Sequence, residues 1–113
     1  AWTPALQGDN LEAAAHIMAP YTVHTTAADY QMRPRFRYQP AQVNFEPLTP
    51  ATLAVPMGEG FINYRVFLKA LYEGGYRGPV AYEMCSPLRG GGSVENLDRC
   101  AGSFLTFLDH LSQ

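Results

Sequence analysis

The stretch VAYEMCSPLRG, residues 80–90, decides the fold class of this chain. Its first half has the composition of a short buried strand, and that strand carries one acid, Glu83, to its end. A loop rich in proline and glycine follows at once, contains Arg89, and leads into a helix. An acid at the carboxyl end of a core strand, followed by such a loop, is how (β/α) barrels build active sites. The stretch therefore predicts an α/β protein with its chemistry near Glu83.

Helices and strands alternate on both sides of this stretch. Residues 9–19 have apolar side chains at helical spacing, with Asp9 placed as a cap, and the β-branched and aromatic residues in 21–30 favour a strand. Asn63 and Ser93 are placed to cap two further helices. The order helix, strand, long loop, helix, strand, helix is typical of a parallel sheet whose ligand site lies at the carboxyl ends of its strands.

Residues 31–60 lack regular periodicity and contain five of the nine prolines. A loop of that length inside a compact domain is commonly functional or disordered. Because this one also carries aromatic and aliphatic side chains, we expect an ordered loop that covers the body, with short extended pieces allowed within it. It includes the run Arg33 to Tyr38, in which arginines and aromatic residues alternate. We expect this run to anchor the loop, or to act as a substrate lid through Arg33 or as a subunit contact.

The chain is too short for a complete barrel. Its 113 residues, 47% apolar and 16% charged, have the composition of a folded protein, whereas an eight-unit barrel typically needs ~250 residues. Two strands are not a self-sufficient parallel sheet, because both faces need cover and an edge stays open. We therefore expect the missing strands to come from more polypeptide or from another copy of the chain in a homo-oligomer.

Charge and composition narrow the range of partners and compartments. The net charge is −2, with acids and bases spread along the chain, so we expect no nucleic-acid partner. No apolar stretch approaches the ~20 residues that cross a bilayer, so we expect no membrane partner. Cys85 and Cys100 are not arranged as a C-x-x-C pair, which favours two reduced thiols. These features predict a cytoplasmic location.

Two segments, VHTTAADY at 23–30 and the thirty residues from Val55 to Met84, carry a family resemblance. They are similar to the C-terminal part of the sugar phosphate isomerase/epimerase family, the xylose-isomerase-like TIM barrels. In that family a V-H-x-H-x-K-D strand, a long loop, a G-x-G-x-x-D helix start and a strand ending in a ligand glutamate follow one another. The resemblance implies that residues 1–113 are the C-terminal portion of a (β/α)8 TIM barrel, two to three units long, with 31–60 as a long βα loop.

The resemblance also implies site residues. Glu83 takes the place of the family's metal-ligand and acid/base glutamate, and His24 matches the first, deeper histidine of the strand motif. Thr26 stands where the family has its metal-ligand histidine, which is a departure from the pattern. The resemblance thus implies Glu83 and His24 as metal ligands for Mn, Mg, Co or Zn, and a sugar or sugar phosphate as the ligand. We expect His24, Arg89 in the glycine-rich loop and Arg33 in the long loop to contact it.

The activity that the resemblance implies is isomerisation or epimerisation of a sugar or sugar phosphate. A divalent metal ion stabilises an enediolate while glutamates move a proton next to the carbonyl. The altered position at Thr26 leaves two alternatives open. One is a catalytically degenerate barrel that binds sugar, and the other is an inactive structural fragment that completes its sheet by oligomerisation. On its own, the 113-residue chain is expected to be inactive.

Overall fold

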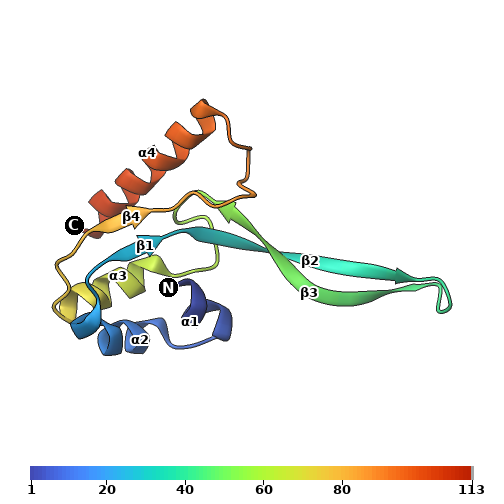
Figure 1. The fold of residues 1–113 in the computed structure, drawn as a ribbon, viewed down its shortest axis with the longest axis horizontal. Helices are drawn as coiled ribbons and strands as arrows, with labels where there is room; N and C mark the ends of the chain where they lie inside the picture. Colours follow the sequence, from blue (N-terminus) through green and yellow to red (C-terminus); the bar gives the residue numbers. More distant parts are fainter. Residues whose placement is uncertain (113) are drawn as a thin grey trace.

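Two short parallel strands lie at the centre of the protein body. The computed structural model describes residues 1–112 and shows a mixed α/β protein (Figure 1). Strand β1 (Thr25–Ala27) pairs with β4 (Val80–Tyr82) in parallel, with Ala27 opposite Tyr82. The other elements are α1 (Trp2–Gln7), α2 (Leu11–Met18), the 3-10 turn η1 (Ala19–Tyr21), β2 (Asp29–Gln39), β3 (Asn44–Val55), α3 (Tyr64–Glu73) and α4 (Val94–Leu111).

The core lies between this strand pair and the helices. Ala27 is fully buried with Phe67 of α3 and Phe104 of α4, and Tyr82 stacks on Phe104 with ring centroids 4.9 Å apart. Because side chains alternate along a strand, Thr26 and its neighbours of the same parity face away from this core. Thr26 is exposed, so that second face of the sheet is open in the described part of the chain.

Local capping signals place the helices where the sequence predicts them. The side chain of Asn63 accepts a hydrogen bond from the Val66 N–H at 3.2 Å, and that of Ser93 accepts from Asn96 at 3.3 Å. For α2 the cap is Asn10 instead of the expected Asp9, since Asn10 Oδ1 accepts from Ala13. No helix in residues 1–112 is both long and apolar enough to cross a membrane.

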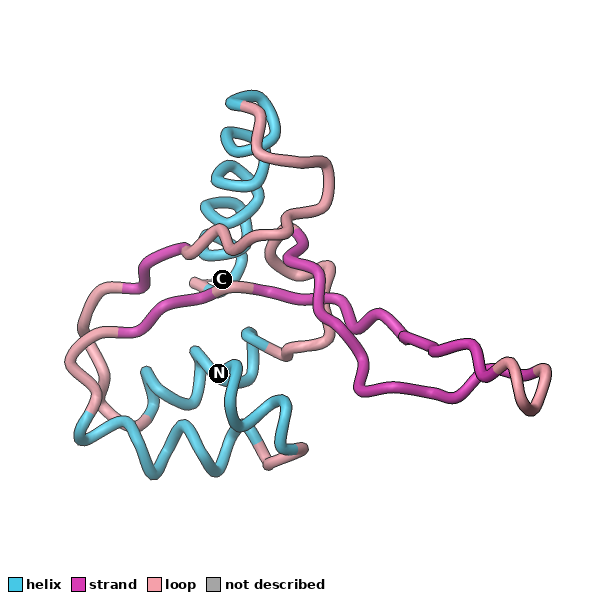
Figure 2. The backbone as a smooth tube through the Cα atoms, turned by 45° about the vertical axis from the view of Figure 1, so that its right-hand side comes forward, coloured by secondary structure: helices cyan, strands magenta, loops and turns pink. Residues whose placement is uncertain are grey.

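Residues 31–60 differ from the loop that the sequence predicts, because most of them form a long β-hairpin. Strands β2 and β3 pair antiparallel from Asp29 opposite Val55 to Gln39 opposite Asn44. The hairpin extends away from the body instead of covering it, and the molecule measures 56 × 35 × 22 Å (Figures 1 and 2). Prolines are compatible with this hairpin because each strand of a two-stranded ribbon is an edge, whose outward N–H groups are dispensable. A register shift next to Pro34 also interrupts the ladder.

Candidate functional site

A cavity of about 320 Å3 opens at the carboxyl ends of β1 and β4. Glu83 is exposed at its wall and is held there because its N–H donates to the Ala27 oxygen at 2.9 Å, which continues the strand pairing by one step. The sequence therefore places Glu83 correctly at a strand end beside a cavity. The lining residues are Ala1, Trp2, Thr26, Ala28, Tyr30, Tyr64, Glu83 and Cys85.

Two tyrosines supply hydroxyl groups to this cavity. The Tyr64 hydroxyl donates to the Ala28 oxygen at 2.8 Å and accepts from the Ala28 N–H at 3.1 Å, so it is committed to holding the backbone after β1. Burial raises the pKa of Tyr64 to about 12. Burial, with a smaller contribution from hydrogen bonding to the Cys85 thiol, raises the pKa of Tyr30 far above its usual range. Both phenols therefore stay protonated at neutral pH, and the Tyr30 hydroxyl is a hydrogen-bond donor in the cavity.

Aromatic rings form one wall of the cavity. The rings of Trp2 and Tyr30 lie 4.2 Å apart between centroids and are tilted by 50°, and Phe61 lies 6.4 Å from Trp2. Aromatic side chains beside a few convergent polar groups also occur in small-molecule sites. No motif in the sequence points to Trp2 or Tyr30 as site residues. The two rings meet because α1 folds back beside β2, and no local sequence pattern predicts that contact.

Asp29 organises the turn that precedes α3. It is 1% exposed, and its Oδ2 accepts from the N–H groups of Gly58 and Gly60 at 3.0 and 2.9 Å. Its Oδ1 accepts from Tyr30 at 2.9 Å and Ile62 at 3.4 Å. A Cβ atom on Gly60 would lie 2.0 Å from Oδ1, so glycine is required there. The Gly58–Gly60 turn is therefore held by a buried carboxylate, which also positions Tyr30.

Arg89 is engaged away from the cavity. Its guanidinium forms an ion pair with Glu59, and the Asn96 side chain donates to the backbone oxygens of Arg89 and Gly91 at 3.0 and 2.6 Å. A Cβ atom on Gly90 would lie 2.8 Å from Asn96 Oδ1, so this loop and α4 approach closely. Arg89, which the sequence predicts as a substrate contact, is thus paired with Glu59 of the Gly58–Gly60 turn and does not line this cavity.

The structure does not bring His24 or Arg33 to Glu83. His24 is exposed just before β1, whereas Glu83 follows β4, and the parallel register separates them by four residues, about 13 Å along the strands. They lie at opposite ends of the sheet and do not share a metal ion in this arrangement. Arg33 is exposed on the hairpin, opposite Ala51. Among residues 1–112, no three His, Cys, Asp or Glu side chains are grouped closely enough to hold a metal ion.

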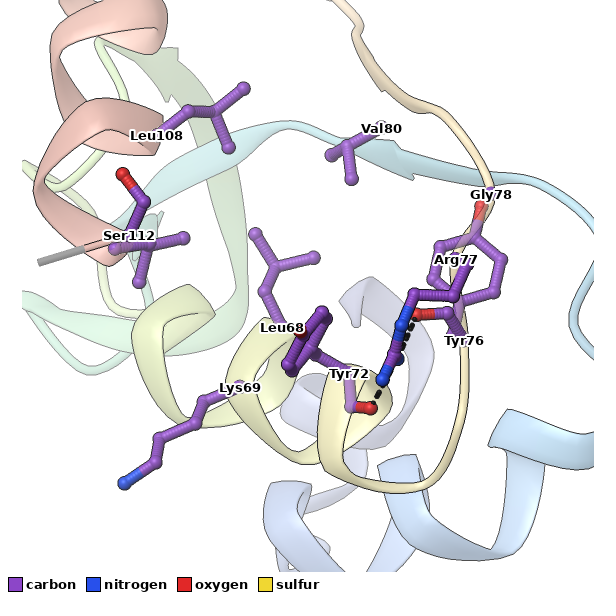
Figure 3. A pocket seen from close by; sticks show the side chains of 10 residues that line it. Leu68, Lys69, Tyr72, Tyr76, Arg77, Gly78, Val80, Leu108 and Ser112 are labelled. Atoms are coloured by element: carbon purple, nitrogen blue, oxygen red, sulfur yellow. Dashed lines mark hydrogen bonds between the residues drawn. The ribbon is translucent and has the colours of Figure 1, made fainter.

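A larger cavity, about 580 Å3, lies between α3 and α4 at the other end of the sheet (Figure 3). Leu68, Val80 and Leu108 give it an apolar lining. Arg77 stacks on the Tyr72 ring at 3.7 Å, and one of its terminal nitrogens donates to two backbone oxygens, so the guanidinium is held in place. No carboxylate is among the lining residues, so this cavity lacks the acid that proton transfer needs.

Comparisons of this chain with models of protein families, with curated proteins and with solved structures find no match. What the cavity beside Glu83 can do is therefore inferred from its own residues.

Proposed function

We propose that this chain is a two-unit portion of a (β/α) barrel and that Glu83 is the acid/base group of a sugar or sugar-phosphate isomerase or epimerase. The observation that carries the proposal is the position of Glu83, at the carboxyl end of a parallel strand and in the wall of a cavity. In (β/α) barrels this is the edge where active sites form.

The arrangement around the strands supports the barrel. Each parallel strand is followed in sequence by a helix, α3 after β1 and α4 after β4, and both helices contribute to one core with Ala27 and Tyr82. The other face of the sheet carries the small side chains Thr26 and Ala81, which lie directly opposite each other. Parallel sheets are normally buried on both faces. The open face therefore supports a barrel in which further strands enclose it. Those strands would come from more polypeptide or from another copy of the chain.

The cavity offers the groups that proton transfer next to a carbonyl requires. The Glu83 carboxylate removes a proton from the carbon beside the carbonyl, and the electron pair moves onto the carbonyl oxygen to form an enediolate. The Tyr30 hydroxyl, which like any tyrosine is protonated at neutral pH, donates a hydrogen bond to that oxygen. Glu83 then returns the proton to the neighbouring carbon while the proton of the adjacent hydroxyl moves to the former carbonyl oxygen, which completes an isomerisation. Epimerisation instead needs a second acid that protonates the same carbon from the opposite face.

The divalent metal ion implied by the family resemblance is not supported by the residues described here. Glu83 is the one carboxylate among the lining residues, and the others offer hydroxyl groups, a thiol and aromatic rings. Divalent ions of the Mg or Mn type need several oxygen or imidazole ligands. These residues alone do not fit the ion. We propose that any further ligands belong to the strands that complete the barrel.

Exchange of substrate hydrogen with solvent tests the proposal. The assembled protein is incubated in D2O with a panel of aldoses, ketoses and their phosphates, and deuterium entering the carbon beside the carbonyl is followed by NMR. Glu83→Gln is expected to lower the exchange rate by about 10²-fold or more. Glu73→Gln, at an exposed position on α3, is the matched control and should leave it unchanged. Absence of exchange in the wild type, or equal rates in Glu83→Gln, overturns the proposal.

A second candidate is a barrel that binds sugar without turning it over. Thr26 at the position of the family's ligand histidine and the Trp2–Tyr30 wall of the cavity favour it. Trp2 is the single tryptophan of the chain, so its fluorescence reports on this cavity directly. A sugar that changes Trp2 fluorescence equally with and without EDTA supports binding alone. A response abolished by EDTA supports the metal-dependent enzyme.

We place either function in the cytoplasm. Cys85 and Cys100 are free thiols, the state that reducing compartments maintain.

A further inference from the structure

The hairpin carries an exposed aromatic face that the sugar chemistry does not use. The name β-arm is used below for residues 31–53. These residues are the outer parts of β2 and β3 together with the turn that joins the two strands. We propose that the β-arm binds a second copy of this chain, with its aromatic face packed on the body of that copy. This inference is independent of the proposed function.

The outer half of the β-arm has two chemically different faces. Phe36 lies opposite Pro47 and Tyr38 opposite Phe45, and residues directly opposite each other share a face. The Tyr38 and Phe45 rings are 5.2 Å apart. The intervening pairs, Arg35 with Leu48 and Arg37 with Glu46, face the other way. One face is therefore aromatic and the other carries arginine side chains.

The exposed aromatic area suits a protein partner. Phe36 and Phe45 are 61% exposed and Tyr38 is 49% exposed. With about 200 Å2 for each ring, these three side chains present about 340 Å2. One side of a standard protein interface buries about 800 Å2, so this face supplies close to half of it. An isolated two-stranded hairpin is also marginally stable in water, so a partner would stabilise the β-arm as well.

The tip of the β-arm gives a second, independent indication. Val43 has a φ of 47° and is 78% exposed. This left-handed conformation is unfavourable for a β-branched residue, and Asn or Gly would adopt it more easily. An apolar side chain is thus held at the tip against its local preference, next to the aromatic face. Packing against a partner compensates for that strain.

The direction of the β-arm argues for another copy over the remainder of a barrel. The arm leaves the carboxyl end of β1 and extends away from the body (Figures 1 and 2). An 11-residue strand is about 36 Å long, so its tip lies well beyond the strand pair. Strands that complete the barrel would flank β1 and β4, where they reach the base of the arm and not its tip.

Charge favours contact between the β-arm of one copy and the body of the other. The arm holds three arginines and one glutamate, net +2, whereas the rest of the chain holds five basic and nine acidic residues, net −4. Two arms would repel each other, and an arm and a body attract. Reciprocal exchange of arms would give a symmetric dimer with two equal contacts.

Sedimentation velocity between 1 and about 100 μM tests the inference. The wild type is expected to form a dimer, and Phe36→Glu with Phe45→Glu is expected to weaken dimerisation by at least about tenfold. The control Gln31→Glu with Gln42→Glu adds the same two charges to the arm but keeps the rings, so it loses only the charge attraction and should dimerise more tightly than the ring variant. Circular dichroism of each variant confirms that the body, whose core does not include these residues, is folded.

The salt dependence of the dimer and a test of oligonucleotide binding distinguish the remaining modes of contact. If arm and body attract, raising NaCl from 50 to 500 mM weakens the dimer, whereas stacked arms would be strengthened because their repulsion is screened. A wild type that stays monomeric at 100 μM, or a ring variant that dimerises as tightly as the wild type, overturns the inference. A monomer that binds a single-stranded oligonucleotide through its arginines and rings also overturns it, and assigns the arm to nucleic acid.

Discussion

Replacing Asp29 by asparagine tests whether one buried carboxylate holds the turn before α3. Four backbone N–H groups, from Gly58, Gly60, Tyr30 and Ile62, donate to its two oxygens. An asparagine amide has one oxygen, so whichever way it is oriented, two of the four donors lose their acceptor. Its NH2 group would then face those N–H groups.

The expected loss of stability follows from these bonds. A hydrogen bond to a charged group contributes about 1.5–3 kcal/mol, so losing two such bonds lowers the free energy of unfolding by about 3–6 kcal/mol. That is a large part of the about 5–15 kcal/mol typical of a domain. For a chain of this length, the melting temperature should fall by about 12 °C or more.

Urea denaturation and amide hydrogen exchange measure the effect. We expect Asp29→Asn to lower the unfolding free energy and to speed exchange at Gly58 and Gly60 more than at core amides of α3. Asp109→Asn, at an exposed position on α4, is the matched control and should change stability by less than about 0.5 kcal/mol. A loss under 1 kcal/mol for Asp29→Asn, or unchanged exchange at both glycines, would refute the reasoning.

Three further outcomes are expected. Tyr64 and Tyr82 have pKa values raised by burial to about 12, so ultraviolet titration should show them ionising later than exposed tyrosines. Their folded pKa exceeds the unfolded value of 10, so their contribution to stability is present below pH 10 and is lost between pH 10 and about 12. Val43→Asn should stabilise the hairpin locally by about 1 kcal/mol, read as slower amide exchange in β2 and β3. Asn96→Ala should lower the free energy of unfolding by about 2 kcal/mol, because two backbone oxygens lose their hydrogen-bond donor. It should also speed amide hydrogen exchange in the 89–92 loop. Equal exchange in this loop in the wild type and the variant would contradict the role assigned to Asn96.

The sequence predicts the position of Glu83 in the candidate site but not the residues that surround it. Glu83 was found because a strand end next to a Pro/Gly-rich loop is visible within about ten residues. The family resemblance predicts that His24 shares a metal ion with Glu83. Whether the two side chains are close depends on the register of β1 with β4, in which Thr25 lies opposite Val80, fifty-five positions away. Trp2 and Tyr30 join the cavity through a contact between α1 and β2, which no spacing in the sequence encodes.

The sequence by itself determined the α3 and α4 boundaries and the strand before Glu83, because caps, helical periodicity and turn residues act over a few positions. Tertiary structure alone decided that residues 31–53 form a projecting β-arm, that Asp29 holds the turn before α3 and that Arg89 pairs with Glu59. Pairing of β2 with β3 overrides the local signal of the prolines, since a two-stranded ribbon needs only half of its N–H groups for the ladder. Asp29 finds its donors about thirty residues away, and only the folded chain brings them together.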